Sequence, residues 1–169
     1  EARRLLGPRR SSVFATPLDV TLDAIDYDDA CARSRQACGK ALSKQAWNLM
    51  PKIRQLDALV SAADSDRIVE AHPECAFMRL HRGEPMDDPK ATLPGRDARR
   101  RALADAGFFD PDELGHLLTE RPPATRIAPM VDMLDALALL STARHVVCGT
   151  EHRLGDQVDH QGRRAEIVY

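Results

Sequence analysis

The sequence predicts a helix-rich α/β fold, arranged as a single domain over residues 1–169. Apolar residues make up 43% of the chain and charged residues 30%, which is a globular composition. Several segments carry the start and stop residues of helices, whereas a β-branched run at residues 67–72 is typical of a strand. Because aromatic residues contribute only 4%, aliphatic side chains must fill the core.

Helices are predicted for most of the first third of the chain. Gly7, followed by a proline, ends the opening helix, and Gly39 ends a later one. Ser43 is a good N-cap for the next helix, which Pro51 should kink or divide. These signals predict a helix at residues 1–6, a short edge strand at 11–14, and helices at 27–38 and 43–62.

The run RIVEAH at residues 67–72 gives the clearest strand signal. It is bounded by Asp66 and Pro73, and period-two alternation places Glu70 and His72 on the same face. A largely apolar strand that carries one acid fits a central position in a sheet, with its end facing a site.

A long loop and three helices are predicted to follow. Residues 80–95 are rich in Gly, Pro, Asp and Lys, so we expect a loop that acts as a lid. Gly149 ends the longest helix, and a turn-like DHQG segment precedes the final strand. The predicted elements are helices at residues 96–106, 111–118 and 129–148, and a closing hairpin whose last strand covers 165–169.

Charge and cysteine usage narrow the class of protein. Lys plus Arg (24) nearly balance Asp plus Glu (26), which disfavours a high-affinity duplex-binding module. No apolar run reaches the roughly 18 residues of a membrane span, and no secretory signal opens the chain. The four cysteines form no CxxC pair and are predicted to be free thiols in a reducing compartment. We therefore expect a cytoplasmic protein without a membrane segment.

Two acids in the segment APMVDMLDALALL are the sharpest local feature. Asp132 and Asp135 are three residues apart, so they point from the same side of a helix, where paired carboxylates can bind a divalent cation. The surrounding helix is apolar nearly all round, as a packed helix would be. In the alternative interpretation, acids in a first turn merely complement the helix dipole.

A second group of candidate site residues lies in IVEAHPE. Glu70 and His72 share a strand face, and Glu74 follows where the strand should give way to a loop. Acids at strand ends are frequent catalytic groups in α/β folds, although a salt bridge to one of the many arginines explains them equally well. Zinc is disfavoured because neither HExxH nor a Cys/His pairing is present.

Two lysines are candidate phosphate contacts. Lys52 lies in the helix that contains Pro51, and a solvated lysine is the alternative interpretation there. Lys90 lies in the predicted lid loop, where charge-assisted contacts to phosphate oxygens are geometrically easy. The motifs GxxxxGK[ST], GxSxG and GxGxxG are absent, so mononucleotide-loop, nucleophile-elbow and dinucleotide-binding functions have no support.

Several segments, taken in order, resemble a family of unknown function predicted to be ribonuclease-H-like nucleases. They are EARRLLGPRRSSVF, LSKQAWNLMPKI, EAHPECAF, the loop around Lys90 and Thr92, DMLDAL and EIVY. The resemblance covers essentially the whole chain. It implies an α/β fold with a ribonuclease-H-like mixed sheet and flanking helices. In such a fold, acidic side chains would hold Mg²⁺ or Mn²⁺, and the metal would assist the hydrolysis of phosphodiester bonds.

The resemblance also implies an N-terminally truncated domain. Members of that family begin with a glycine- and aspartate-bearing strand and a later Asp-Ile-Pro-Gly-like strand, and both precede the equivalent of Glu1. The chain is therefore predicted to be the C-terminal portion of such a domain, without its first-strand aspartate. Whether it is active as it stands is left open.

Two hypotheses follow for function. The first is a metal-dependent nuclease-like protein that acts on nucleic acid or another phosphoester. The alternative is a catalytically silent α/β module that binds a nucleotide or a protein partner, its acids serving as caps and salt bridges. For the first hypothesis the predicted metal ligands and catalytic residues are Glu70, Asp132 and Asp135, with His72, Glu74, Lys52 and Lys90 as supporting groups.

Overall fold

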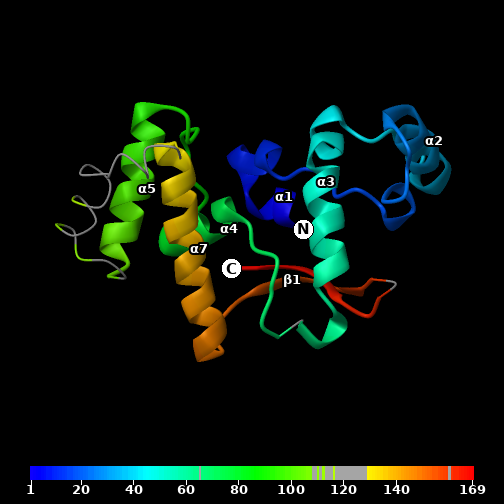
Figure 1. The fold of residues 1–169 in the computed structure, drawn as a ribbon. Coiled ribbons are helices and arrows are strands. Elements are labelled where there is room, and N and C mark those ends of the chain that lie inside the picture. Colours follow the sequence, from blue (N-terminus) through cyan, green and yellow to red (C-terminus); the bar gives the residue numbers. More distant parts are fainter. Residues whose placement is uncertain (65, 108–109, 111, 113–115, 117–128, 160) are drawn as a thin grey trace. The chain divides into compact units, whose positions relative to one another are not determined.

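The structure is a computed structural model that describes residues 1–64, 66–107, 110, 112, 116, 129–159 and 161–169. It is helix-rich with one small sheet, which confirms a mixed α/β chain (Figure 1). The described elements are α1 (Ala2–Leu5), η1 (Gly7–Ser12), η2 (Asp19–Thr21), α2 (Tyr27–Cys38), α3 (Lys44–Leu59), η3 (Ala62–Asp64), α4 (Pro73–Leu80), α5 (Leu93–Asp105), α7 (Met130–Cys148), β1 (Arg153–Val158) and β2 (Arg164–Val168).

The chain divides into two compact units. Unit 1 comprises Glu1–Val13, Val69–Gly155 and Glu166–Tyr169, and unit 2 comprises Phe14–Ile68 and Asp156–Ala165. The single-domain organisation stays a prediction. None of the described helices is long and apolar enough to cross a membrane.

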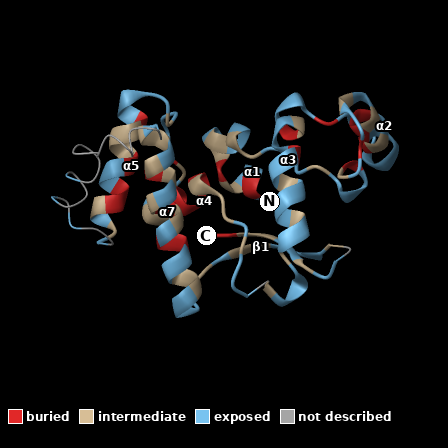
Figure 2. Cartoon of the chain, viewed as in Figure 1, coloured by how far each residue is buried: buried red, intermediate tan, exposed pale blue. Residues whose placement is uncertain are grey.

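The core of unit 1 lies where α4, α5 and α7 pack against one another (Figure 1). Figure 2 marks buried positions on the packed sides of α5 and α7. Phe77, Leu103 and Leu134 contribute one fully buried side chain from each helix, and Met86 adds a fourth from the loop between α4 and α5. The core is aliphatic apart from Phe77, as the low aromatic content requires.

A second cluster of unit 1 forms around Leu6 of α1. It includes Cys75 and Met78 of α4, and residues from both strands pack against it. The two strands form one antiparallel ladder that continues to reciprocal bonds between His152 and Tyr169. The predicted closing hairpin is confirmed.

Unit 2 is built on α2 and α3. Its core contains Cys31 and Ala46, with Tyr27 and Trp47 packed against it, and the ring centroids of these two aromatics are 6.0 Å apart. Ser43 caps α3 as predicted, accepting a hydrogen bond from the amide of the third helical residue. The helix continues through Pro51 as one element and ends at Leu59, so Pro51 does not divide it, and the kink stays a prediction.

The predicted strand at residues 67–72 is wrong. Only Ala71 forms a bridge, a parallel one to Val168, and Val168 donates its amide to the carbonyl of Glu70. The reason is local: His72 and Pro73 are an N-cap and a first helical residue, so α4 begins where the strand should have continued. The expected edge strand at residues 11–14 is also wrong, because its two serines belong to η1.

Two further predictions change at their boundaries. Helix α5 begins at Leu93 instead of residue 96, because Thr92 caps it and a proline fits its first turn. Helix α7 matches the predicted 129–148 closely, with Pro129 at the N-cap. The predicted helix at 111–118 lies largely outside the described residues. The described sheet has two strands, so the ribonuclease-H-like sheet stays a prediction.

All four cysteines are free, as predicted. Cys31 and Cys75 are buried, whereas Cys38 and Cys148 are exposed.

Candidate functional site

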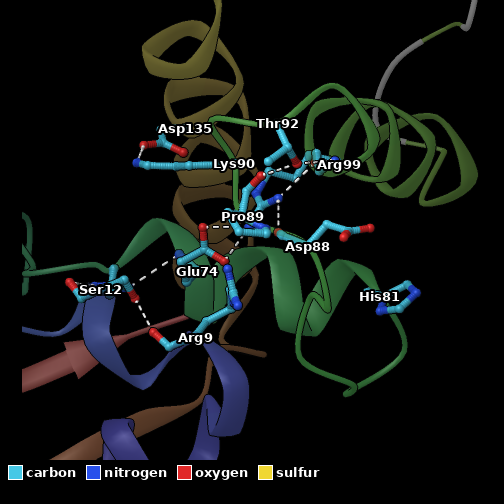
Figure 3. A network of polar contacts seen from close by, with 12 residues as sticks. Arg9, Ser12, Glu74, His81, Asp88, Pro89, Lys90, Thr92, Arg99 and Asp135 are labelled. Carbon is cyan, nitrogen blue, oxygen red and sulfur yellow. Dashed lines mark hydrogen bonds and ion pairs between the residues drawn. The ribbon is translucent and has the colours of Figure 1, made fainter.

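A buried ion pair between Glu74 and Arg99 lies at the centre of the polar network of unit 1 (Figure 3). One guanidinium nitrogen, Nη2, donates to both carboxylate oxygens of Glu74 at 2.7 Å. The side chain of Arg99 is 0% exposed and that of Glu74 is 4% exposed. Buried charges are tolerated only when paired, so this pair neutralises an acid that the sequence offered as a site residue.

The second terminal nitrogen of the Arg99 guanidinium, Nη1, donates to two backbone carbonyls. Nη1 donates to the carbonyl of Gly95 at 2.8 Å and to that of Asp88 at 3.1 Å. The guanidinium also lies over the ring of Phe77, 5.4 Å from its centroid. A single side chain therefore ties together α4, the first turn of α5 and the loop between them.

The loop at residues 81–92 is anchored along its length. Met86 is 2% exposed and lies in the core. Thr92 donates its hydroxyl to the carbonyl of Pro89 at 2.8 Å and accepts the amide of Gly95 at 3.2 Å. A Cβ on Gly95 would lie 2.0 Å from the same Pro89 carbonyl oxygen, so only glycine fits there. The expected lid is a packed loop in this structure.

Lys90 and Asp135 form the second ion pair of the site, 2.5 Å from Nζ to Oδ2 (Figure 3). The aspartate side chain is only 15% exposed, and the lysine is 41% exposed. The other carboxylate oxygen, Oδ1, is buried and receives no hydrogen bond from the described residues. Thus the structure brings together two predicted site residues that are 45 positions apart.

Asp132 occupies the first turn of α7 and is exposed. No ion pair or hydrogen bond joins it to another described residue, which agrees with a role at the helix N-terminus and leaves its carboxylate free. Among the described residues, no three His, Cys, Asp or Glu side chains converge into a group that could hold a metal ion.

Glu70 and His72 precede α4. Glu70 is exposed, yet desolvation by the surrounding protein raises the pKa of its carboxyl. No described contact joins Glu70 to Asp132 or Asp135. The Nδ1 atom of His72 accepts the amide of Glu74 at 3.2 Å, so Nε2 carries the proton and faces the carbonyl of Ser12 at 3.2 Å. His72 therefore caps α4.

Lys52 belongs to unit 2, where it is exposed on α3. Its role as a phosphate contact stays a prediction.

Sequence reasoning missed Arg99, although a signal was present. Arg99 stands beside Arg96, Arg100 and Arg101 in the sequence, and such a basic cluster is typical of a solvated patch. Yet Gly95, Arg99 and Ala102 recur at helical spacing on the face of α5 that also carries Leu103, so the pattern puts Arg99 on the apolar stripe. A charged residue on such a stripe must find a buried partner.

Comparison with known proteins identifies the family of this chain. No curated protein and no solved structure matches this chain. A family described as "Protein of unknown function (DUF429)" matches residues 1–160. That match covers most of each unit and includes all the candidate site residues. The chain therefore belongs to the DUF429 family.

Proposed function

We propose that the protein is a ribonuclease-H-like, metal-dependent nuclease that binds a phosphoester of nucleic acid beside α7. The observation that supports this most directly is the state of Asp135. One of its oxygens is neutralised by Lys90, while the other is buried and receives no hydrogen bond from the described residues. An orphaned carboxylate oxygen is costly unless a ligand satisfies it.

The chain offers a donor set that fits Mg²⁺ or Mn²⁺ in part. Mg²⁺ keeps several waters and is commonly held by one or two carboxylates together with substrate phosphates, so it does not require a cage of three acids. Asp135 would supply one ligand and Asp132 a second, with Glu70 as the third ligand that the sequence suggests. When bound, such an ion would polarise the phosphoester and acidify a water.

Lys90 would contribute the second charge of the site. Its ammonium is paired with Asp135, and Lys90 would be available to a phosphate oxygen if this carboxylate instead held a cation. Glu74 takes no direct part on this proposal, because its carboxylate is already saturated by Arg99. We place the protein in the cytoplasm, a proposal supported by its four free cysteines.

The test is a Mn²⁺ titration of the purified chain by calorimetry, combined with thermal unfolding with and without the ion. We expect Mn²⁺ to raise the unfolding midpoint and Asp135→Asn to abolish the rise while leaving the metal-free midpoint nearly unchanged. Asp105→Asn is the matched control, since Asp105 is an exposed acid on α5. Equal Mn²⁺ affinity in both variants and the unmodified chain would contradict the proposal.

A second candidate function is a silent module that binds a nucleotide or protein partner. It is favoured by the absence of any three-ligand group among the described residues and by the existing pairing of Asp135 with Lys90. Incubation with labelled single-stranded and duplex oligonucleotides separates the two. Cleavage that needs Mn²⁺ and is lost in Asp135→Asn supports the nuclease, whereas metal-independent binding without cleavage supports the module.

A further inference from the structure

The short segment Asp88–Pro89–Lys90 joins the buried ion pair to the exposed end of the site. The carbonyl of Asp88 accepts from Arg99, and the ammonium of Lys90, two residues later, reaches Asp135. The residue between them is a proline, whose ring fixes one of its two soft backbone dihedrals. The Pro89 carbonyl is itself held by the hydroxyl and the amide of Thr92. The backbone leading to Lys90 is therefore fixed on both sides.

Arg99 is the residue that connects this segment to the helices. Its guanidinium reaches Glu74 on α4, Gly95 on α5 and Asp88 in the loop with donors that diverge in one plane. A lysine at this position could satisfy Glu74 but has no rigid fork to bridge the two carbonyls at the same time.

We infer that Arg99, held by Glu74, is a positioning residue that sets Lys90 against Asp135 through the carbonyl of Asp88. No described contact joins Arg99 to the carboxylate of Asp135. Any effect of Arg99 on phosphoester binding rests on the proposed function, whereas the effect of Arg99 on the Lys90–Asp135 pair does not depend on it. The buried pair is thus more than packing, because it determines where the loop presents its cation.

A merely structural role for Arg99 makes a different prediction. In that case its loss would lower the stability of every variant by the same amount and leave the interaction between Lys90 and Asp135 intact. A double-mutant cycle separates these outcomes, because it measures only the pairwise interaction. The cycle uses Lys90→Met and Asp135→Asn, alone and combined.

The experiment measures this cycle by chemical denaturation, followed by circular dichroism, without metal or nucleic acid. With Arg99 in place, we expect removal of Lys90 to change the effect of Asp135→Asn on the unfolding equilibrium constant about threefold. In the paired variant Glu74→Leu/Arg99→Met, which removes both buried charges together, we expect that coupling to disappear. Arg100→Met, an exposed neighbour on α5, should leave it unchanged.

Arg99→Lys gives a second background, in which the charge opposite Glu74 is kept and the bridge to Asp88 is broken. Loss of the coupling in either folded background supports the inference, and full coupling in both overturns it. Because the cycle contains no ligand, its result is independent of the Mn²⁺ titration. A chain that couples as expected but binds no Mn²⁺ would retain the positioning role of Arg99 and lose the proposed nuclease function.

Discussion

Arg99 and Glu74 are 25 residues apart in the chain, and one nitrogen of the guanidinium donates to both oxygens of the carboxylate at 2.7 Å. Both side chains are shielded from solvent. The pair joins α4 to α5 beside the aliphatic core, where either charge alone would have no water to solvate it. The two residues therefore depend on each other, and this dependence can be measured.

Glu74→Ala should destabilise the protein by about 3–5 kcal/mol, because it leaves the Arg99 charge buried without a partner. The measurement is urea denaturation followed by circular dichroism. The matched control is Glu74→Leu/Arg99→Met, which removes both charges and retains apolar volume, and it should cost far less or even stabilise. If the two variants lose equal stability, burial of the unpaired charge is not the cause.

Gly95→Ala should destabilise the protein by about 1–3 kcal/mol through steric overlap. The added Cβ would meet the carbonyl oxygen of Pro89 at 2.0 Å, and this oxygen belongs to backbone that cannot rotate away. Asp97→Ala, an exposed change two residues later on the same helix, should stay within about 0.5 kcal/mol of the unmodified chain. Thermal unfolding of the two variants side by side checks this, and equal midpoints would show that the loop yields at no cost.

We expect ionisation of the Cys75 thiol to lower the free energy of unfolding of the protein as the pH rises above 9. Burial, with a smaller contribution from the charge of Glu74, raises the pKa of its thiol from 9.0 to about 11. Between these values the unfolded chain loses the proton while the folded chain retains it, so deprotonation favours unfolding. Below pH 9 both states are protonated and the effect vanishes.

The measurement for Cys75 is a series of urea denaturations between pH 8 and pH 11, which spans the shift in pKa. Cys75→Ala is the control, and its stability should decline less steeply with pH than that of the unmodified chain. Parallel slopes would mean that the native thiol ionises as readily as the unfolded one.

Lys90→Met should weaken the binding of a single-stranded oligonucleotide and lower its salt dependence. If Lys90 meets one phosphate, the slope of log affinity against log salt should fall by about 0.7, because one fewer counterion contact is made. Lys52→Met tests the other predicted phosphate contact by the same titration. An unchanged slope in either variant removes that lysine from the set of phosphate contacts.

Local chemistry explains which elements could be predicted from the sequence. Caps and stop residues act within a few positions, so Ser43 correctly marked the start of α3, and Gly39 and Gly149 correctly marked the ends of α2 and α7. The hairpin was likewise predictable from its turn. In each case the signal and the structure that it specifies lie in the same stretch of chain.

The prediction of a strand at residues 67–72 was wrong because it considered the β-branched pattern alone. The start of helix α4 competes with the strand at the same residues. His72 caps α4 through its ring, a role that is unusual for histidine and hard to anticipate. With Pro73 at the first helical position, the chain turns into a helix after a single bridge at Ala71. Period-two alternation in a run of six residues was too weak a signal to exclude this.

The site was predictable as a set of residue types but not as a set of pairs. Lys90 and Asp135 were both named, but their contact depends on α7 packing beside the loop. Glu74 was predicted to be a supporting group of the metal site, whereas the fold pairs its carboxylate with Arg99. An acid's partner is decided by long-range packing, which no local spacing encodes.

The position of Trp47 determines what an optical unfolding experiment can report. It is the sole tryptophan of the chain and lies in unit 2, where it packs near Tyr27, whereas Tyr169 is the only tyrosine of unit 1. Tryptophan emission therefore follows the melting of unit 2, while far-ultraviolet circular dichroism also records α4, α5 and α7. Coincident transitions would establish one cooperative unit, and separated transitions would give two free energies of unfolding where a single fit reports one.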